Sequence, residues 1–272
     1  MARHIVDGMK SAEPFNRRKT CRYGEMVFNR HDRYIGRSLE LYGEFSEGEA
    51  RLFATFLQPG MLVVEAGANL GALTLALSGL VGNEGAVIAF EPQRMVFHLL
   101  CANLALNSIS NVFAYQKAVG SQEGTLLVPQ LDPAAETNFG GLPLGSWDSG
   151  EQVPLVSLDG MRFPRLDLLK ADVEGMEEQV LAGATETIAR HRPILYLEDD
   201  RPEQSESLQS RIRSVRYRIY RHLPPLFNPN NFGGNAENVF PGIVSSNLLC
   251  VPEESGWEPP DFDSGHLPET SG

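Results

Sequence analysis

The sequence predicts an α/β protein whose doubly wound, mostly parallel sheet is covered by helices on both faces. From residue 61 to residue 119, short β-branched runs alternate with longer amphipathic runs, which is the β-α-β-α-β order of such a sheet. A chain of 272 residues, of which 42% are apolar, can bury one large core of this kind. The first predicted strand ends in a glycine loop, and this fold class binds ligands at that edge of the sheet.

The predicted elements follow one another in close succession. In the first half they are a strand at 61–66, a helix at 70–80, a strand at 85–91, a helix at 94–107 and a strand at 111–119. In the second half they are strands at 123–129 and 153–159, a strand at 166–171, a helix at 176–191, a strand at 193–198, a helix at 207–215 and strands at 216–221 and 246–252. Gly/Pro/Asp-rich residues 130–150 and Asn-rich residues 223–242 are predicted loops.

Composition argues against several classes of protein. The 23 basic and 35 acidic residues give a net charge of −12, whereas a nucleic-acid binder ordinarily needs a basic face. Cys21, Cys101 and Cys250 are widely spaced, so neither a disulfide framework nor a zinc site is indicated, and a reducing cytoplasm fits. Residues 1–10 lack the apolar core of a signal peptide, and the glycines and Glu65 within 61–82 argue against a membrane helix. We therefore expect a cytoplasmic protein with no nucleic-acid or membrane partner.

Three regions are expected along the chain. Residues 1–48 form an N-terminal arm that could cap a bound cofactor, residues 49–251 the main domain, and residues 252–272 an acidic, disordered tail. Tyr42 and Glu44 adjoin the segment that leads into the first strand, so we expect them near the ligand. A homodimer is compatible with the sequence, which contains no feature that sets the oligomeric state.

The glycine loop indicates a nucleoside ligand. Glu65 ends the first strand, and Gly67, Asn69 and Gly71 follow it before the helix. Glu91 ends the next strand, where an acidic residue commonly accepts hydrogen bonds from ribose hydroxyls. The middle glycine of a dinucleotide-binding loop is replaced by Asn69, and Glu65 would repel a pyrophosphate. The loop therefore suits the ammonium and sulfonium groups of S-adenosylmethionine better than NAD.

Several motifs resemble the FkbM family of S-adenosylmethionine-dependent methyltransferases. They are V-E-A-G-A-N-L-G, I-A-F-E-P, A-V-G-S, V-P-L-V-S-L-D, L-L-K-A-D-V-E-G-M-E and R-P-I-L-Y-L-E, and the resemblance extends from about residue 49 to residue 199. D-V-E-G-M-E is the most specific of them. The resemblance implies a Rossmann-like class I methyltransferase fold with a seven-stranded sheet, and methylation of a hydroxyl oxygen in a natural product or saccharide. Glu65 stands where aspartate is commoner.

The resemblance also implies roles for individual residues. Glu65, Gly67, Asn69 and Gly71 would surround the methionine end of the donor, and Glu91 would hold the ribose. Pro92 would lie near the adenine, Lys117 and Ala118 would lie at its edge, and Asp172 would face the reacting methyl group.

An alcohol must lose its proton before it attacks the methyl group, so a base or a metal ion is expected. Asp172 and Glu174 are the candidate catalytic carboxylates, and a metal-free reaction is preferred because the sequence has no compact ligand motif. The alternative is Mg²⁺ held by Asp172 with Asp199 or Asp200.

The acceptor is expected to bind beneath the two predicted loops. Phe139, Trp147, Phe227 and Phe232 would provide apolar walls. Asn228, Asn230 and Asn231 would bind hydroxyl groups of a polyol or a sugar-bearing product. Two other functions remain open, an NAD-dependent oxidoreductase and a non-catalytic nucleoside-binding module.

Overall fold

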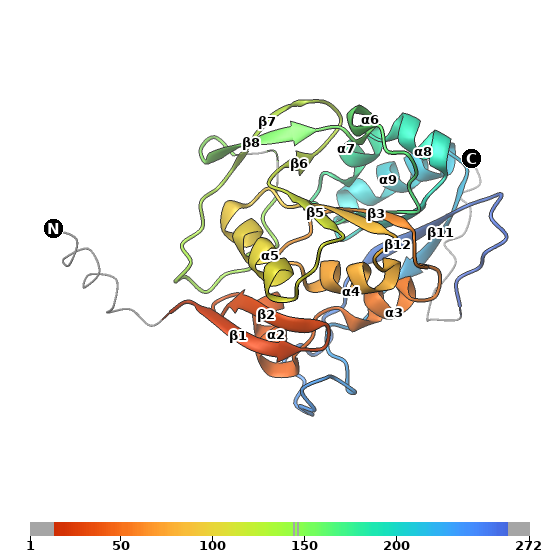
Figure 1. The fold of residues 1–272 in the computed structure, drawn as a ribbon. Coiled ribbons are helices and arrows are strands. Elements are labelled where there is room, and N and C mark those ends of the chain that lie inside the picture. The colour runs from red at the N-terminus through yellow and green to blue at the C-terminus, as the bar shows by residue number, and fades with distance from the viewer. Residues whose placement is uncertain (1–13, 144, 146, 261–272) are drawn as a thin grey trace.

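The computed structural model describes residues 14–143, 145 and 147–260 (Figure 1). Within them, a central seven-stranded sheet has the strand order β11-β12-β10-β9-β3-β4-β5. All neighbouring strands are parallel except for the two pairs that β12 forms with β10 and β11. The strands are β3 (Leu62–Ala66), β4 (Ala86–Phe90), β5 (Val112–Tyr115), β9 (Leu168–Ala171), β10 (Ile194–Glu198), β11 (Tyr217–His222) and β12 (Asn247–Pro252). The predicted doubly wound, mostly parallel seven-stranded sheet is therefore confirmed.

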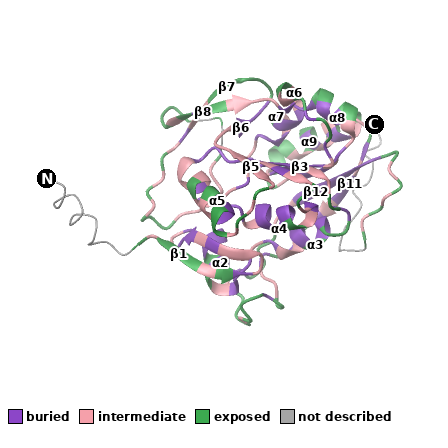
Figure 2. Ribbon diagram, viewed as in Figure 1, coloured by how far each residue is buried: buried purple, intermediate pink, exposed green. Residues whose placement is uncertain are grey.

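Helices cover both faces of this sheet. Leu73 and Leu77 of α4 and Phe53 of α3 pack on Val63 of β3 on one face, and α5 completes that layer. The other face packs against the second group of helices. The helices of the first layer are α3 (Glu47–Phe53), α4 (Ala72–Val81) and α5 (Arg94–Leu106), and those of the second are α6 (Leu158–Met161), α7 (Glu177–Ala182), α8 (Thr185–His191) and α9 (Pro202–Ser214). The buried residues follow the strands and the inner helix faces (Figure 2).

The predicted strand 111–119 is wrong as a single element. β5 ends at Tyr115, and a turn in which the Lys117 N–H donates to the Tyr115 carbonyl redirects the chain. β6 (Ala118–Val119) then pairs with β8 (Glu151–Val156), which also pairs with β7 (Gly124–Val128) in a separate three-stranded sheet. Periodicity cannot reveal such a turn because the apolar residues continue through it.

The described part of the N-terminal arm is folded onto the main domain. β1 (Asn16–Cys21) and β2 (Gly24–Asn29) form a hairpin, followed by α2 (Ile35–Tyr42). The Asn103 amide of α5 bonds the backbone of Val27 in β2 in both directions, at 2.6 and 3.0 Å. Residues 1–13 of the arm lie outside the described residues.

The beginning of the predicted disordered tail is packed against the sheet. Pro252 completes β12, and the Trp257 ring lies 5.2 Å from the Phe56 ring. Arg218 donates to the carbonyls of Ser255 and Trp257. The acidic composition of the tail predicted disorder, but a single tryptophan, Trp257, attaches this segment to the sheet. Residues 261–272 lie outside the described residues.

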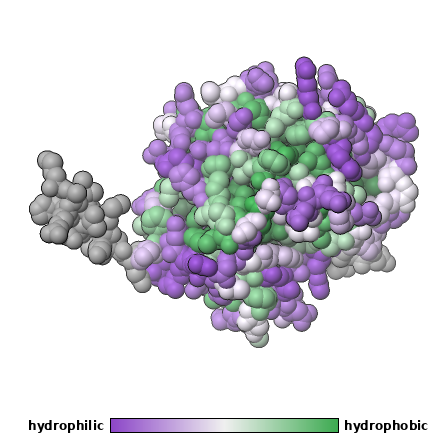
Figure 3. Space-filling view, in the orientation of Figure 1, coloured by the Kyte–Doolittle hydropathy of each residue, from purple (hydrophilic) through white to green (hydrophobic). Residues whose placement is uncertain are grey.

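No helix within residues 14–260, apart from the two undescribed positions, is long and apolar enough to cross a membrane. On the face shown in Figure 3, apolar residues gather over the middle of the molecule and hydrophilic residues surround them.

Candidate active site

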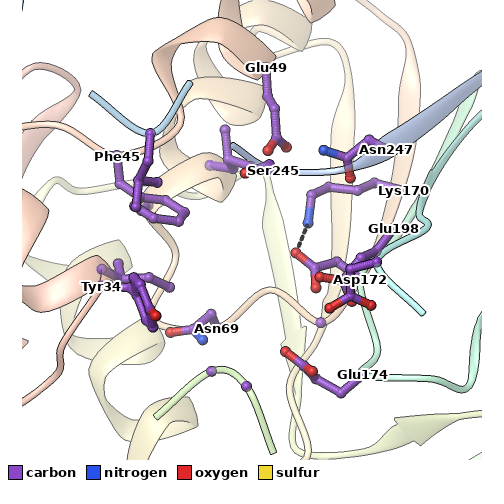
Figure 4. Close-up of a pocket in the computed structure, with 18 of the residues that line it drawn as sticks. Tyr34, Phe45, Glu49, Asn69, Lys170, Asp172, Glu174, Glu198, Ser245 and Asn247 are labelled. Carbon is purple, nitrogen blue, oxygen red and sulfur yellow. Dashed lines mark hydrogen bonds and ion pairs between the residues drawn. The ribbon is translucent and has the colours of Figure 1, made fainter. Parts of the chain in front are cut away.

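A cavity of about 370 Å³ opens at the carboxyl ends of β3, β4, β9 and β10. Its lining comes from the glycine loop, the strand ends, the arm and the β11–β12 connection (Figure 4). The lining residues include Tyr34, Phe45, Glu49, Glu65, Gly67, Asn69, Glu91, Asn138, Gly140, Lys170, Asp172, Glu174, Glu198, Asp200, Leu226, Ile243, Val244, Ser245 and Asn247.

The glycine loop has almost no free space behind it. Gly67 has φ +82°, and a Cβ at this position would lie 1.8 Å from the Asp172 carbonyl oxygen. Asn69 also has a positive φ, 50°, and its N–H donates to a Glu91 carboxylate oxygen at 2.9 Å. The Gln93 N–H donates to the other Glu91 oxygen at 2.8 Å. Burial raises the pKa of Glu91 to about 7.

A buried lysine lies below the loop, and the sequence analysis did not identify it. The Lys170 ammonium is 3.4 Å from an Asp172 oxygen and 4.0 Å from a Glu65 oxygen. Burial would lower the pKa of Lys170, but the Asp172 and Glu65 carboxylates outweigh it and raise that pKa above its usual value. Glu65 also accepts a 2.6 Å hydrogen bond from Thr74, and burial raises the pKa of Glu65 to about 7. Glu65 is thus held by residues of the protein itself.

Three carboxylates meet where β9 and β10 end. Asp172, Glu174 and Glu198 each place an oxygen within 4.8 Å of the others. Arg201 bonds Glu174 at 2.7 Å and lies 3.5 Å from Glu198. Burial and the Asp172 charge raise the pKa of Glu174 to about 7, and the same causes raise that of Glu198 further.

Among the described residues, the carboxylates at a spacing that could hold a metal ion are Asp172, Glu174 and Glu198, rather than the expected Asp172 with Asp199 or Asp200. Asp199 accepts a 2.8 Å hydrogen bond from Ser205 of α9, whereas Asp200 is paired with Arg201. Successive residues of a strand end point to opposite faces, so Glu198 rather than Asp199 lies beside Asp172. The Arg201 guanidinium supplies positive charge to this cluster through Glu174, Glu198 and Asp200.

The structure brings together some of the predicted donor residues and separates others. Glu65, Gly67, Asn69, Glu91, Asp172 and Glu174 line the cavity. Pro92 borders a side cavity of about 40 Å³ that continues past Glu91. Gly71, at the start of α4, packs against Leu100. Lys117 lies in the turn that follows β5, and Ala118 lies beyond it, buried in the three-stranded sheet.

Tyr42 and Glu44 hold the β11–β12 connection and do not line the cavity. The Tyr42 hydroxyl donates to the Glu237 carbonyl and accepts from the Val239 N–H. The Glu44 carboxylate pairs with Arg22 at 2.7 Å and accepts from Asn228 at 2.8 Å. We expected both residues near the ligand because they precede α3 in the sequence. Their polar groups instead bind the β11–β12 connection.

The two predicted acceptor loops contribute different residues from those expected. Asn138 and Gly140 of the first loop line the cavity, whereas Phe139 is buried behind it. The Trp147 indole is exposed and donates to the Pro143 carbonyl.

In the second loop, Phe227 packs on Tyr42, and Phe232 is exposed. Asn228 and Asn231 bond within the loop, where Asn231 donates to the carbonyls of Asn228 and Asn235. The Asn230 carbonyl accepts from Arg22. The part of this connection that faces the cavity is Leu226 and residues 243–247.

Other cavity residues were missed because their role depends on strand neighbours. Glu49 lies at a helix start, Asn247 opens the last strand, and Gln93 follows Glu91 by two residues. Lys170 carried a usable signal, since a lysine inside the apolar run L-L-K-A requires a buried partner.

Comparisons with known proteins agree with this architecture. A sequence profile of the methyltransferase FkbM domain matches residues 65–221, more than half of the chain. Methyltransferase sdnD of Sordaria araneosa is 30% identical over 169 residues, covering 46% of this chain and 60% of that protein. Methyltransferase 1 of Beauveria bassiana is 29% identical over 144 residues, covering 44% of this chain and 57% of that protein. The chain therefore spans less than two thirds of both relatives.

A crystal structure of methyltransferase FkbM from Methylobacillus flagellatus KT matches with a TM-score of 0.49 and 20% identity, covering 70% of this chain and 43% of that chain. The domain match and the sheet order together confirm the resemblance found in the sequence. The chain belongs to the methyltransferase FkbM family.

Proposed function

We propose that the chain binds S-adenosylmethionine and transfers its methyl group to a hydroxyl oxygen of a small molecule, such as a saccharide or a glycosylated or polyketide natural product. The observation that carries the donor assignment is that two buried acceptor groups, those of Glu91 and Gln93, border the same side cavity. Gln93 Nε2 donates to the Phe139 carbonyl at 3.0 Å, which orients the amide and leaves Oε1 as the acceptor. Gln93 Oε1 is buried and has no partner among the described residues.

The hydrogen-bond donors of adenosine match the two acceptors, Glu91 and Gln93. The ribose hydroxyls would donate to Glu91, and the adenine amino group would donate to Gln93 Oε1 in the side cavity bordered by Pro92 and Leu142. Gln93 would thus take the place predicted for Lys117 and Ala118.

The charge of the cavity favours a sulfonium donor over NAD. Asp172, Glu174 and Glu198 lie beside the glycine loop and would repel a pyrophosphate, whereas they attract a sulfonium.

Asp172 and Glu174 are the proposed catalytic carboxylates. One of them would take the hydroxyl proton while the oxygen attacks the methyl carbon, and the carbon–sulfur electron pair would return to sulfur. Glu174 suits a base because its pKa, raised to about 7, lies near neutral pH.

Isothermal titration tests the donor assignment. We expect saturable binding of S-adenosylmethionine and S-adenosylhomocysteine and none of NAD. S-inosylhomocysteine, in which a carbonyl replaces the adenine amino group, should bind at least about tenfold more weakly because an acceptor would face Gln93 Oε1. Gln93→Leu should reduce that difference.

Tight NAD binding without any response to the methyl donor would indicate the oxidoreductase. A protein that binds the donor but transfers no labelled methyl group to any of a panel of glycosides and macrolide aglycones would favour the binding module. Titration with Mg²⁺ alone should give no saturable heat, and saturable Mg²⁺ binding lost in Asp172→Asn would contradict the metal-free proposal.

A further inference from the structure

One wall of the cavity is apolar and reaches the surface. Tyr34 and Phe45 come from the arm, and Leu226, Ile243 and Val244 from the β11–β12 connection. Ile243 and Val244 are 37% and 46% exposed, so the apolar wall extends from the cavity to the surface. This wall offers contact area to an apolar body that enters from the mouth.

The opposite wall is strongly acidic, as Figure 4 shows for Asp172, Glu174 and Glu198. The carboxylates lining the cavity are Glu49, Glu65, Glu91, Asp172, Glu174, Glu198 and Asp200, and the one lining cation among the described residues is Lys170. Arg201, which does not line the cavity, forms an ion pair with Glu174 and partly neutralises its charge. An anionic molecule would be repelled here even if several of these carboxyls were protonated.

A buried amide lies between the two walls. Asn247, at the start of β12, is 5% exposed and lines the cavity, and its Nδ2 has no hydrogen-bond partner among the described residues. In Figure 4 this amide lies beside Ser245 and above Lys170. A buried N–H without a partner indicates that a ligand oxygen accepts from it.

We propose that the methyl acceptor is an uncharged alcohol with a largely apolar body, which lies against Tyr34, Phe45 and Val244 while one of its oxygens accepts from Asn247 Nδ2. This inference rests on the proposed function and narrows it. A free sugar leaves the apolar wall without contact, and an acid meets like charges on the opposite wall. Two of the asparagines expected to bind a polyol have other partners, since the Asn228 amide donates to Glu44 and the Asn231 amide to the Asn228 carbonyl, which agrees with the apolar assignment.

Three probes test the acceptor class by titration into protein saturated with S-adenosylhomocysteine, below their micelle concentrations. Octyl β-glucoside has an apolar body and no charge, glucose lacks the body, and octanoate carries a charge. Octyl β-glucoside should bind at least tenfold more tightly than the other two. Val244→Asp and Asn247→Leu should each weaken it at least fivefold, whereas Phe113→Asp, at an exposed apolar residue of β5, should leave it unchanged.

Retained binding of S-adenosylhomocysteine shows that each variant is folded. If Val244→Asp does not fold, Val244→Ser is used in its place. The inference would be overturned if octanoate or glucose bound as tightly as octyl β-glucoside, or if octyl β-glucoside showed no saturable binding. It would also be overturned if Phe113→Asp weakened octyl β-glucoside binding as much as Val244→Asp does. Wild-type protein that fails to bind S-adenosylhomocysteine would instead refute the proposed donor.

Discussion

Two of the seven described non-glycine residues with positive φ lie at the cavity. Asn69 and Glu174 both line it with positive φ, at 50° and 56°, although Glu rarely adopts this conformation. Each has a positive-φ glycine nearby: Gly67 abuts the Asp172 carbonyl and Gly175 abuts Arg201. Such conformations persist where surrounding contacts hold them, and they are commoner at functional sites than elsewhere. The tight contact at Gly67 joins the ends of β3 and β9.

Gly67→Ala should therefore affect stability and donor binding together. The added Cβ would force the Asp172 backbone away and would require a positive φ, which we expect to cost about 3 kcal/mol of unfolding free energy. Urea unfolding and titration with S-adenosylhomocysteine measure the two effects. Gly79→Ala, in α4 where a Cβ meets nothing within 4 Å, is the matched control and should stabilise the protein by about 0.5–1 kcal/mol. Equal results for the two variants would contradict this account.

The antiparallel end of the sheet closes the cavity. β12 lies between β10 and β11, and its pairing brings Asn247 opposite both Glu198 and His222. His222 Nδ1 lies 2.8 Å from the buried Tyr196 hydroxyl of β10. Burial lowers the pKa of His222 to about 4. The strand that pairs with the one contributing Asn247 therefore carries a histidine that is neutral in the folded protein.

This histidine makes stability depend on pH in a defined direction. Between about pH 4 and 6.5 the unfolded chain binds a proton at His222 and the folded protein does not, so stability falls as the pH is lowered through this window. Between pH 7.5 and 5 the wild type should lose about 2 kcal/mol more than His222→Asn. Urea unfolding at both pH values measures this difference. The comparison with the variant is needed because carboxyls with raised pKa values have the opposite dependence. Parallel losses in the two proteins would show that His222 is not responsible.

At the scale of the molecule, both flanking segments belong to the folded unit. The arm supplies cavity residues such as Tyr34, and α3, which spans the predicted boundary between residues 48 and 49, packs into the core beside β3. At the other end, Trp257 covers Phe56 on the side of the sheet that faces α3 and α4. A protein shortened to residues 49–251 would lack the contacts of both flanking segments.

Trp257→Ala should destabilise the protein without changing the donor site. Loss of a half-buried aromatic side chain is expected to lower the unfolding free energy by about 1–2 kcal/mol. Urea unfolding measures this change, and titration should show unchanged affinity for S-adenosylhomocysteine because Trp257 does not line the cavity. Wild-type stability in this variant would support the original prediction that the tail is not attached.

The sequence by itself determined the fold class and the edge of the sheet that carries the site. Strand and helix periods are local, so the alternation from residue 61 onward and the glycine loop could be recognised without the structure. Glu65, Glu91 and Asp172 were found because a carboxylate at the end of an apolar strand is a local signal. The FkbM motifs likewise lie within continuous segments.

Only the tertiary structure decided which side chains share the cavity. The turn after Tyr115 carries Ala118 into another sheet, and the pairing of β12 brings Asn247 to the cavity from more than 150 residues beyond Glu91. Glu198 rather than Asp199 joins Asp172 because the direction of a side chain at a strand end depends on the register of its neighbours. Side-chain periodicity records whether a residue is buried, but the partners of a buried polar group are set by contacts between segments far apart in the chain.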